Sequence, residues 1–194
     1  MHIIMYSKYK TSQIRRKTIR HYNIIGHAHF LTFSCYQRLP FLGKERARRW
    51  LIDAVLRARE KHRYALLAYV IMPEHVHLLV YPLDHEYNIS LFLKSVKQSV
   101  ARRARNYLEE NDRNWLERLI VKRGNKHVFR FWQAGPGYDR NIVNKEELFE
   151  KIKYIHNNPV RSELVSNPEE WKWSSAGWYN GEKDVVMTLD ELII

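Results

Sequence analysis

The sequence YALLAYVIMPEHVHLLVY at residues 64–81 decides the fold of this chain. Residues 64–72 are an uninterrupted run of apolar and β-forming side chains that ends at Pro73, which predicts a buried strand. Pro73 and Glu74 make a tight connection, and residues 75–81 return as a second apolar strand. The two strands are therefore expected to pair as a β-hairpin.

The segments before this hairpin predict one more strand and one helix. Residues 29–35, HFLTFSC, are rich in β-forming residues and end before a polar turn at residues 37–40. Apolar residues then recur with helical spacing from Ala47 to Ala58.

The segments after the hairpin predict two helices and a short strand. Helical spacing of apolar residues returns between Ile89 and Leu108, on a helix with a basic side. A Gly-Pro-Gly turn at residues 135–137 precedes a short strand at residues 138–143. Asn144, followed three residues later by Glu147, resembles a capping box that begins a helix running to about residue 157. Residues 111–130 are polar and show no clear pattern.

The predicted order β-α-β-β-α-β, followed by one helix, is the split βαβ, ferredoxin-like arrangement. The expected fold is therefore α+β, with an antiparallel sheet, helices on one face, and an additional C-terminal helix. We expect three regions in the chain, which are a basic arm at residues 1–25, one domain at residues 26–180 and a tail at residues 181–194.

The charge of the chain indicates an anionic partner. Its 194 residues include 33 Lys and Arg against 21 Asp and Glu, a formal net charge of +12. Neutralisation of such an excess with release of counterions favours binding of nucleic acid. The candidate DNA contacts lie in two basic clusters, Arg15, Arg16 and Lys17 in the arm and Lys94, Lys97 and Arg102 on the second helix.

The composition also bounds the location of the protein. A single cysteine, Cys35, excludes an intramolecular disulfide and a cysteine metal cluster, which suits a reducing cytoplasm. The longest apolar run has nine residues and ends at Pro73, and the N-terminus has no apolar signal region. We therefore expect a cytoplasmic protein without a membrane span or a secretory signal.

Two histidines in the second strand of the hairpin are candidate metal ligands. His75 and His77 are two residues apart, so both imidazoles project from one face of the sheet. Two neutral imidazoles can share a divalent metal ion, although a hydrogen-bonded pair with a structural role fits the same spacing. A second such pair, His27 and His29, is interpreted as structural.

The last helix contributes a phenol and an amide. Tyr154 and Asn158 are spaced i, i+4, which places both side chains on one helix face. A tyrosine can act as a nucleophile and form a covalent phosphoryl intermediate, with a metal at His75 and His77 polarising the phosphodiester. A partly packed tyrosine and a helix-capping asparagine are the structural alternatives.

Four blocks of this sequence resemble the REP-associated tyrosine transposases, over about residues 30–179. The blocks are VIMPEHVHLLV at 70–80, FWQ at 131–133, YIHNNPV at 154–160 and WKWSS at 171–175. These proteins are part of the wider group of insertion-sequence transposases that combine a His-hydrophobic-His motif with one catalytic tyrosine.

The resemblance implies a ferredoxin-like fold and metal-dependent cleavage of single-stranded DNA beside a hairpin such as a repetitive extragenic palindrome. Transesterification would pass through a 5′-phosphotyrosine with a free 3′-hydroxyl. By position, Tyr154 is the implied nucleophile on the C-terminal helix, and His75, His77 and Asn158 are the implied ligands of Mg²⁺ or Mn²⁺. The wider group often has glutamine where this chain has Asn158. Two imidazoles alone would also suit zinc.

Several alternatives stay open. Tyr138 is a rival nucleophile near the last strand, and Glu150, one helical turn before Tyr154, is either a solvated carboxylate or a group near the metal. Glu74 is either support for the histidines or an exposed turn residue. The chain could instead be a non-catalytic protein that binds hairpins, or a metal-dependent nuclease that uses water. Relatives include monomers and dimers, so a homodimer is also open.

Overall fold

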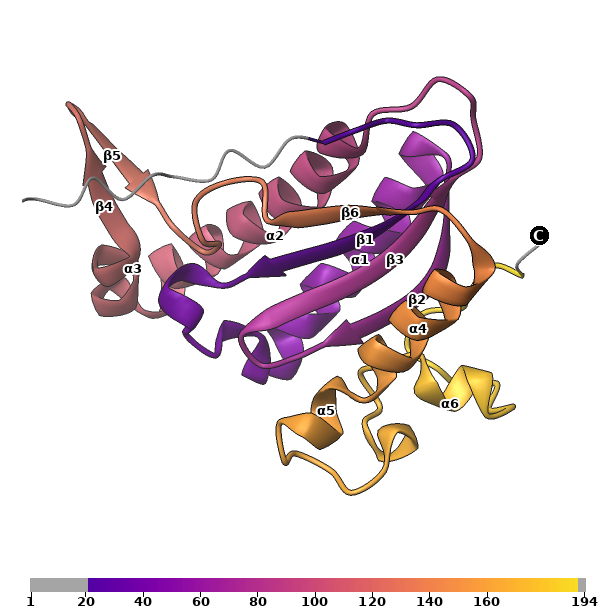
Figure 1. Ribbon diagram of the computed structural model, residues 1–194. Helices are drawn as coiled ribbons and strands as arrows, with labels where there is room; N and C mark the ends of the chain where they lie inside the picture. Colours follow the sequence, from indigo (N-terminus) through magenta and orange to yellow (C-terminus); the bar gives the residue numbers. More distant parts are fainter. Residues whose placement is uncertain (1–20, 192–194) are drawn as a thin grey trace, which may run out of the picture.

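A computed structural model describes residues 21–191 of the chain (Figure 1). The main sheet has four antiparallel strands in the order β2-β3-β1-β6. This order, with two helices as crossovers, confirms the predicted ferredoxin-like α+β fold. The strands of this sheet are β1 (Ala28–Ser34), β2 (Tyr64–Ile71), β3 (His75–Pro82) and β6 (Tyr138–Ile142).

Helices cover both faces of this sheet. The long helices α1 (Glu45–His62) and α2 (Ile89–Asn111) pack on one face, and α4 (Lys145–His156) packs on the other. Strand β2 is accordingly buried along its whole length, and β3 is exposed only at Tyr81. The two long helices thus pack their apolar faces against one face of the sheet, as predicted. The additional C-terminal helix packs against the opposite face.

Strand β3 carries the two histidines and lies between two other strands. It pairs with β1 from His29↔Val80 to Ser34↔His75, and with β2 from Tyr64↔Pro82 to Ile71↔Val76. Val76, Leu78 and Val80 face α1 and α2, whereas Leu79 faces α4. His75 and His77 share the parity of Leu79, so both imidazoles lie on the α4 face.

Residues 113–129, which lie in the polar stretch without a clear sequence pattern, form a separate projection. The short helix α3 (Arg113–Leu119) leads into a two-stranded ribbon of β4 (Ile120–Arg123) and β5 (Lys126–Phe129). In Figure 1 this ribbon extends away from the main sheet.

The C-terminal part of the chain completes the outer edge of β2. The backbone N–H of Ile71 donates to the carbonyl of Trp173, and that of Ser175 donates to the carbonyl of Tyr69. The short helices of this part are α5 (Asn158–Arg161) and α6 (Ala176–Tyr179). Further along, Asp190 accepts from the N–H of Leu66, and its own N–H donates to the Leu66 carbonyl. An unpaired strand edge is a site for pairing with another chain, and here the protein covers it with its own residues.

A glycine fixes the approach of β6 to β1. Gly137 has a φ of +90°, and a Cβ at this position would lie 2.4 Å from the carbonyl oxygen of Thr32. Any side chain here would therefore clash with backbone as well as strain the residue. The predicted turn at residues 135–137 brings Tyr138 beside β1 for this reason.

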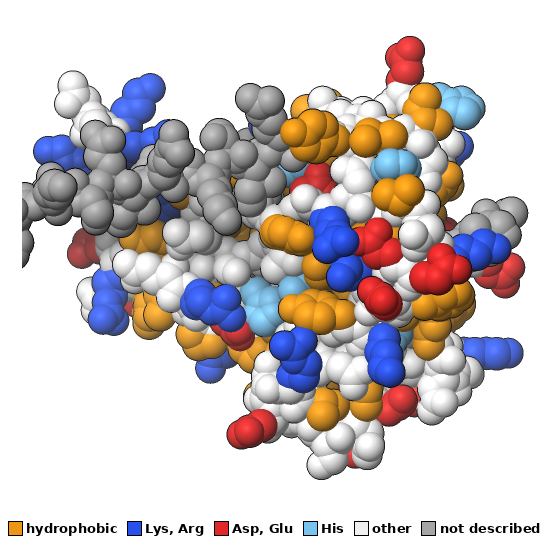
Figure 2. Space-filling view, in the orientation of Figure 1, with side chains coloured by type: hydrophobic (Ala, Val, Ile, Leu, Met, Phe, Trp, Pro, Cys, Tyr) orange, Lys and Arg blue, Asp and Glu red, His pale blue; other side chains and the backbone are white. Residues whose placement is uncertain are grey.

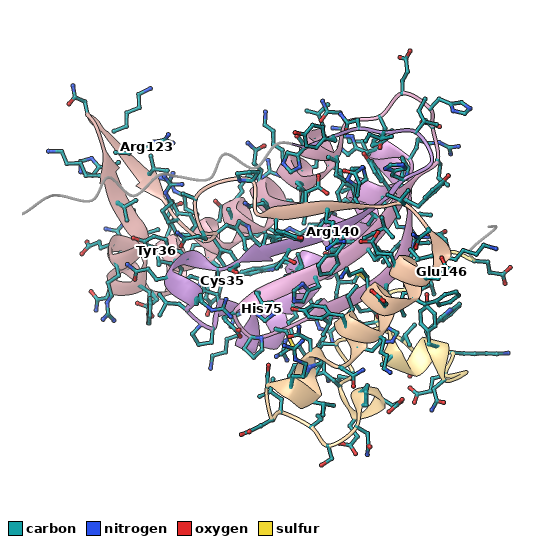
Figure 3. All side chains as sticks on the ribbon, in the orientation of Figure 1. Cys35, Tyr36, His75, Arg123, Arg140 and Glu146 are labelled. Carbon is teal, nitrogen blue, oxygen red and sulfur yellow. The ribbon has the colours of Figure 1, made fainter. Side chains whose placement is uncertain are left out.

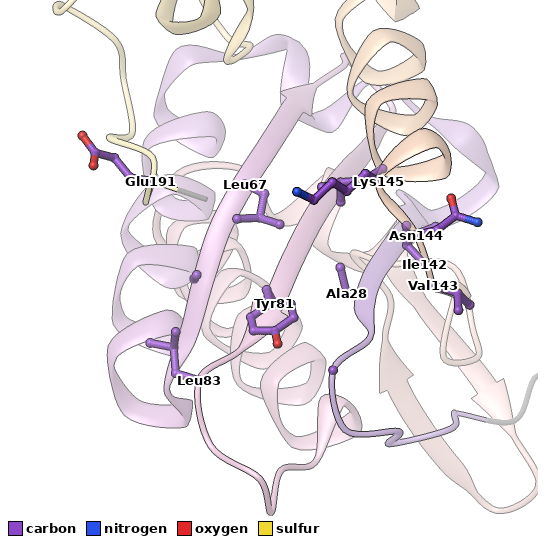
Figure 4. A pocket seen from close by; sticks show the side chains of 12 residues that line it. Ala28, Leu67, Tyr81, Leu83, Ile142, Val143, Asn144, Lys145 and Glu191 are labelled. Atoms are coloured by element: carbon purple, nitrogen blue, oxygen red, sulfur yellow. The ribbon is translucent and has the colours of Figure 1, made fainter. Parts of the chain in front are cut away.

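Two further features of the described residues are a buried thiol and a cavity away from His75. The thiol of Cys35 is fully buried, and burial raises its pKa to about 12. A cavity of about 340 Å³ opens on the α4 face at the end of β3 away from His75, between Leu67 and Tyr81 of the sheet and Lys145 of α4 (Figure 4).

Among the helices of residues 21–191, none is long and apolar enough to cross a membrane.

The packing of β3 against α1 and α2 gives a stability prediction. Leu78 is fully buried in this layer, so Leu78→Ala should lower the free energy of unfolding by about 2–5 kcal/mol through reduced burial and a residual cavity. Urea denaturation of both proteins measures the difference. Leu91→Ala on the exposed side of α2 is the control and should change stability by less than about 0.5 kcal/mol. Equal effects of the two substitutions would contradict this description of the core.

Candidate active site

His75 and His77 form a tightly packed pair on the α4 face of the sheet. Their Nε2 atoms lie 3.1 Å apart, and the rings meet edge to face with centroids 4.8 Å apart. Both side chains are buried, at 8% and 4% exposure. His75 is labelled in Figure 3, and Figure 2 shows histidine atoms at this part of the surface with Lys and Arg side chains around them.

The outer nitrogen of each imidazole has a hydrogen-bond partner. His75 Nδ1 lies 2.7 Å from Glu74 Oε1, and His77 Nδ1 lies 2.7 Å from the hydroxyl of Thr32 on β1. A carboxylate only accepts, so His75 donates from Nδ1 and its Nε2 holds a lone pair. The amide nitrogen of Asn158 is a donor that faces His77 Nε2, so this Nε2 also carries a lone pair while the Thr32 hydroxyl accepts from Nδ1. Both Nε2 lone pairs therefore turn toward one point.

The electrostatics keep His77 neutral. The pKa of His77 is lowered to about 3, chiefly by burial and in smaller part by the neighbouring His75 and Arg161. A neutral imidazole is the form that binds a metal ion.

The donor set fits a divalent cation. Two lone pairs 3.1 Å apart repel each other unless a proton or a cation lies between them. Adjacent ligands around an ion with bonds of about 2.1 Å are about 3 Å apart, which is close to this spacing. In residues 21–191, no three His, Cys, Asp or Glu side chains are grouped to hold a metal, so a third protein donor would have to be of another type.

Asn158 is such a donor. Its side chain is buried, and its amide nitrogen lies 3.1 Å from Nε2 of His77. Rotation of the carboxamide by 180° would exchange this nitrogen for the oxygen, which is the atom that binds hard cations. The shorter side chain of asparagine therefore still reaches the histidine pair.

Tyr154 on α4 lies beside the same histidine. Its ring meets that of His77 edge to face with centroids 5.5 Å apart, and it contacts Phe30 in the same way at 5.8 Å. The side chain is 37% exposed, so solvent and substrate can reach it. The guanidinium carbon of Arg161 lies 5.1 Å from the centroid of the Tyr154 ring. A cation therefore lies close to the phenol.

The helix that carries Tyr154 ends close to the predicted end at about residue 157, so Asn158 lies on the next helix. Helix α4 ends at His156, Asn157 is its C-cap, and Asn158 begins α5 with Pro159 in its first turn. Proline lacks the N–H that a helix interior requires, but it is tolerated in a first turn. Despite the turn at Asn157, the side chains of Tyr154 and Asn158 both contact His77.

The structure places the two rival groups differently. Tyr138 on β6 is exposed and contacts the ring of Phe30, with centroids 6.1 Å apart, instead of a histidine ring. Glu150 is exposed on α4.

His29 is buried on the opposite face of the sheet, where its ring nitrogens contact Asp139 and Tyr87, which agrees with a structural role.

The predicted DNA contacts are not gathered at this site. Lys94 and Arg102 are exposed on α2, which packs on the other face of the sheet. The amine of Lys97 donates to the carbonyl of Gly135 at 2.8 Å, and burial lowers the pKa of Lys97 to about 8. Arg15, Arg16 and Lys17, with the rest of the basic arm up to residue 20, lie outside the described residues.

Two residues of the site were not predicted from the sequence. Thr32 is found only through the register that sets it opposite His77, and Arg161 only through the turn that brings α5 back to Tyr154. Glu74, left open between two roles, contacts both His75 and the guanidinium of Arg38.

Two solved structures are similar to this chain. A structure described as a REP-associated tyrosine transposase bound to a REP hairpin superposes with a TM-score of 0.65 at 19% identity, over 91% of this chain and 98% of the other. A crystal structure of a candidate transposase from Deinococcus radiodurans R1 is 21% identical, over 72% of this chain and 97% of the other, with a TM-score of 0.42. No curated protein matched the sequence.

The ferredoxin-like sheet carries a histidine pair and a facing tyrosine on one face. The model of the family described as IS200-like transposases matches residues 1–158. The chain therefore belongs to the IS200-like transposase family, which confirms the resemblance to transposases seen in its sequence.

The hydrogen bond from Thr32 to His77 can be tested by itself. Thr32→Val keeps the shape of the side chain but leaves Nδ1 of His77 without its partner, which should lower the free energy of unfolding by about 1–3 kcal/mol. Thr32→Ser keeps the hydroxyl and should retain most of the stability. Chemical denaturation of the three proteins measures this. If the valine variant were as stable as the serine variant, the hydroxyl would not support the imidazole.

Proposed function

We propose that this protein cleaves and rejoins single-stranded DNA beside hairpins formed by imperfect palindromes, with Tyr154 as the nucleophile. The observation that carries the proposal is the convergence of Asn158 and Tyr154, from a distant part of the chain, on the pair formed by His75 and His77. Membership of a transposase family supports DNA as the substrate. A similar fold described as bound to a REP hairpin supports a hairpin as the DNA structure beside the cleavage site.

In the proposed reaction, the phenol oxygen of Tyr154 forms a bond to the phosphorus of one phosphodiester, and the bond from phosphorus to the 3′-oxygen breaks. The phenol proton is lost, the leaving 3′-oxygen takes up a proton, and the 5′-phosphate remains on the tyrosine. Rejoining is the reverse reaction with a 3′-hydroxyl of another strand. The number of phosphodiester bonds is conserved, so no nucleotide cofactor is needed.

His75, His77 and Asn158 would hold a divalent ion, Mg²⁺ or Mn²⁺, whose chemistry is to neutralise the phosphodiester and orient it for in-line attack. Glu74 and Thr32 keep the two Nε2 atoms directed inward, which is a common arrangement around metal-binding histidines. The guanidinium of Arg161 favours the negative charge that develops on the phenol oxygen and on the phosphate.

The remaining expectations are proposals of the same kind. Arg15, Arg16, Lys17, Lys94, Lys97 and Arg102 would contact DNA beyond the cleavage site. Of these, Lys94 and Arg102 are exposed on the far face of the sheet, and Lys97 already contacts Gly135. A homodimer would have to use a surface other than the outer edge of β2, which the C-terminal part of the chain covers. The reaction would take place in the cytoplasm.

The nucleophile can be identified by covalent trapping. A labelled DNA hairpin with single-stranded flanks, taken from the source genome and incubated with Mn²⁺, should give a protein–DNA adduct on a denaturing gel. Tyr154→Phe removes the attacking oxygen and should abolish the adduct. Tyr138→Phe is the matched control on the same face of the sheet and should keep it.

Other outcomes separate the alternatives. Cleavage that survives Tyr154→Phe and is lost in Tyr138→Phe would transfer the role to Tyr138. Cleavage without any adduct would indicate a nuclease that uses water, and binding without cleavage would indicate a hairpin-binding protein.

The metal site can be tested without DNA. Binding of Mn²⁺ to the folded state alone should raise the free energy of unfolding by about 2.7 kcal/mol at 100 times the Kd. His75→Ala or His77→Ala removes one of two adjoining ligands and should abolish this increase, measured by thermal unfolding with and without Mn²⁺. His85→Ala, at an exposed position, is the control and should keep it. Stabilisation that persists in both site variants would place the metal elsewhere.

A further inference from the structure

The β4–β5 ribbon, residues 120–129, is a basic surface that the proposed reaction does not use. It extends from the body of the protein, with Arg123 labelled near its tip in Figure 3. Residues 120–130 include four Lys and Arg, one His and no Asp or Glu. The basic side chains of the ribbon itself are all exposed, and they are Lys122, Arg123, Lys126 and His127.

The strand register places basic side chains of β4 directly opposite basic side chains of β5. Arg123 is directly opposite Lys126, and Lys122 is directly opposite His127. Directly opposite residues lie on the same face of a ribbon, where the like charges of Arg123 and Lys126 destabilise the pairing. Among the ion pairs within residues 21–191, none involves these four side chains. An anionic partner would relieve this repulsion.

The root of the ribbon is apolar and anchored. Ile120 is opposite Phe129 and Val121 is opposite Val128, and Phe129 packs against the main core. The N–H of Arg130 donates to the Leu119 carbonyl at 2.7 Å, which closes the root. The ribbon therefore presents its charges from a fixed base.

The residues just after the ribbon connect it to the end of the sheet that carries His75. Trp132, just after the ribbon, bridges to Cys35, and the N–H of Cys35 donates to the carbonyl of Glu74. The N–H of Tyr36 donates to the Phe131 carbonyl at the same place. The root of the ribbon therefore lies at the end of the sheet that carries His75.

We propose that the β4–β5 ribbon holds the double-stranded stem of the DNA hairpin, by contacts of Lys122, Arg123 and Lys126 with backbone phosphates. The major groove of B-DNA is about 12 Å wide and admits a two-stranded β-ribbon. Arg123 and Lys126 on one face of the ribbon and Lys122 on the other suit the two phosphate backbones that border such a groove. The inference rests on the proposed function for the position of the stem beside the cleavage site.

The test compares equilibrium binding of two DNA probes by the full chain. One probe is a hairpin with a stem of about one helical turn, about 10 base pairs, and a single-stranded flank, and the other is the flank alone. The ribbon variant carries Lys122→Ala, Arg123→Ala and Lys126→Ala. The control variant removes the same charge at exposed positions elsewhere, through Arg57→Ala, Lys61→Ala and Lys183→Ala.

The ribbon variant is expected to bind the stem-bearing probe at least about tenfold more weakly at low salt, and to bind the flank alone as the wild type does. Its slope of log K against log salt on the stem-bearing probe should fall by up to about 2.7, or about 0.9 for each phosphate that the protein no longer neutralises. The control variant should keep both values. Circular dichroism and thermal unfolding verify that the variants are folded.

The inference would be overturned if the ribbon and control variants lost the same affinity for the stem-bearing probe, because the loss would not be specific to the ribbon. It would also be overturned if the ribbon variant lost the same affinity for both probes, because the loss would not depend on the stem. Tighter ribbon-dependent binding of the same stem made of RNA would overturn the assignment to DNA. Covalent trapping on the same probes separates this result from the proposed function. An adduct together with unaffected stem binding refutes the ribbon alone, and ribbon-dependent stem binding without any adduct refutes the cleavage reaction alone.

Discussion

The approach of two imidazole nitrogens to 3.1 Å is the constraint on which this structure depends. Two buried rings hold that spacing only if their other nitrogens are satisfied and their backbone is fixed on both sides. Strand β3 meets the second condition because β1 and β2 pair with it along its length. The outer nitrogens are satisfied by Glu74, from the turn before β3, and by Thr32 of β1. Gly137 allows β6 to approach β1 closely at Thr32. The site is therefore built into the middle of the sheet.

Much of the fold could be predicted because its long elements bury continuous apolar patterns. Residues 64–81 predict the central hairpin, and the two long helices have regular apolar faces. The β4–β5 ribbon could not be predicted in this way, because each strand has only four residues and three of the eight are solvated cations. The pattern that identifies a strand needs a buried face, and this ribbon buries only its root.

The candidate site shows a similar division. His75 and His77 are visible in the sequence because alternation in a strand is enough to bring them together. The end of α4 near Asn157 is also predicted, but the return of α5, which brings Arg161 to Tyr154, is not visible in the sequence. Lys97 lies off the apolar face of α2 and so looks like a free cation. The loop with Gly135 and Trp132 comes from a distant part of the chain and packs on it.

The cover on the outer edge of β2 has a consequence for biosynthesis. Asp190, which pairs with Leu66, is translated 124 residues later. At about 5–20 residues per second, a ribosome needs about 6–25 seconds to bridge that interval. During this time a nascent chain with its hairpin already made presents a long apolar strand edge to neighbouring polypeptides. Chaperone binding to the nascent chain would be of most use in this window, and slow translation of the last third of the message would lengthen it.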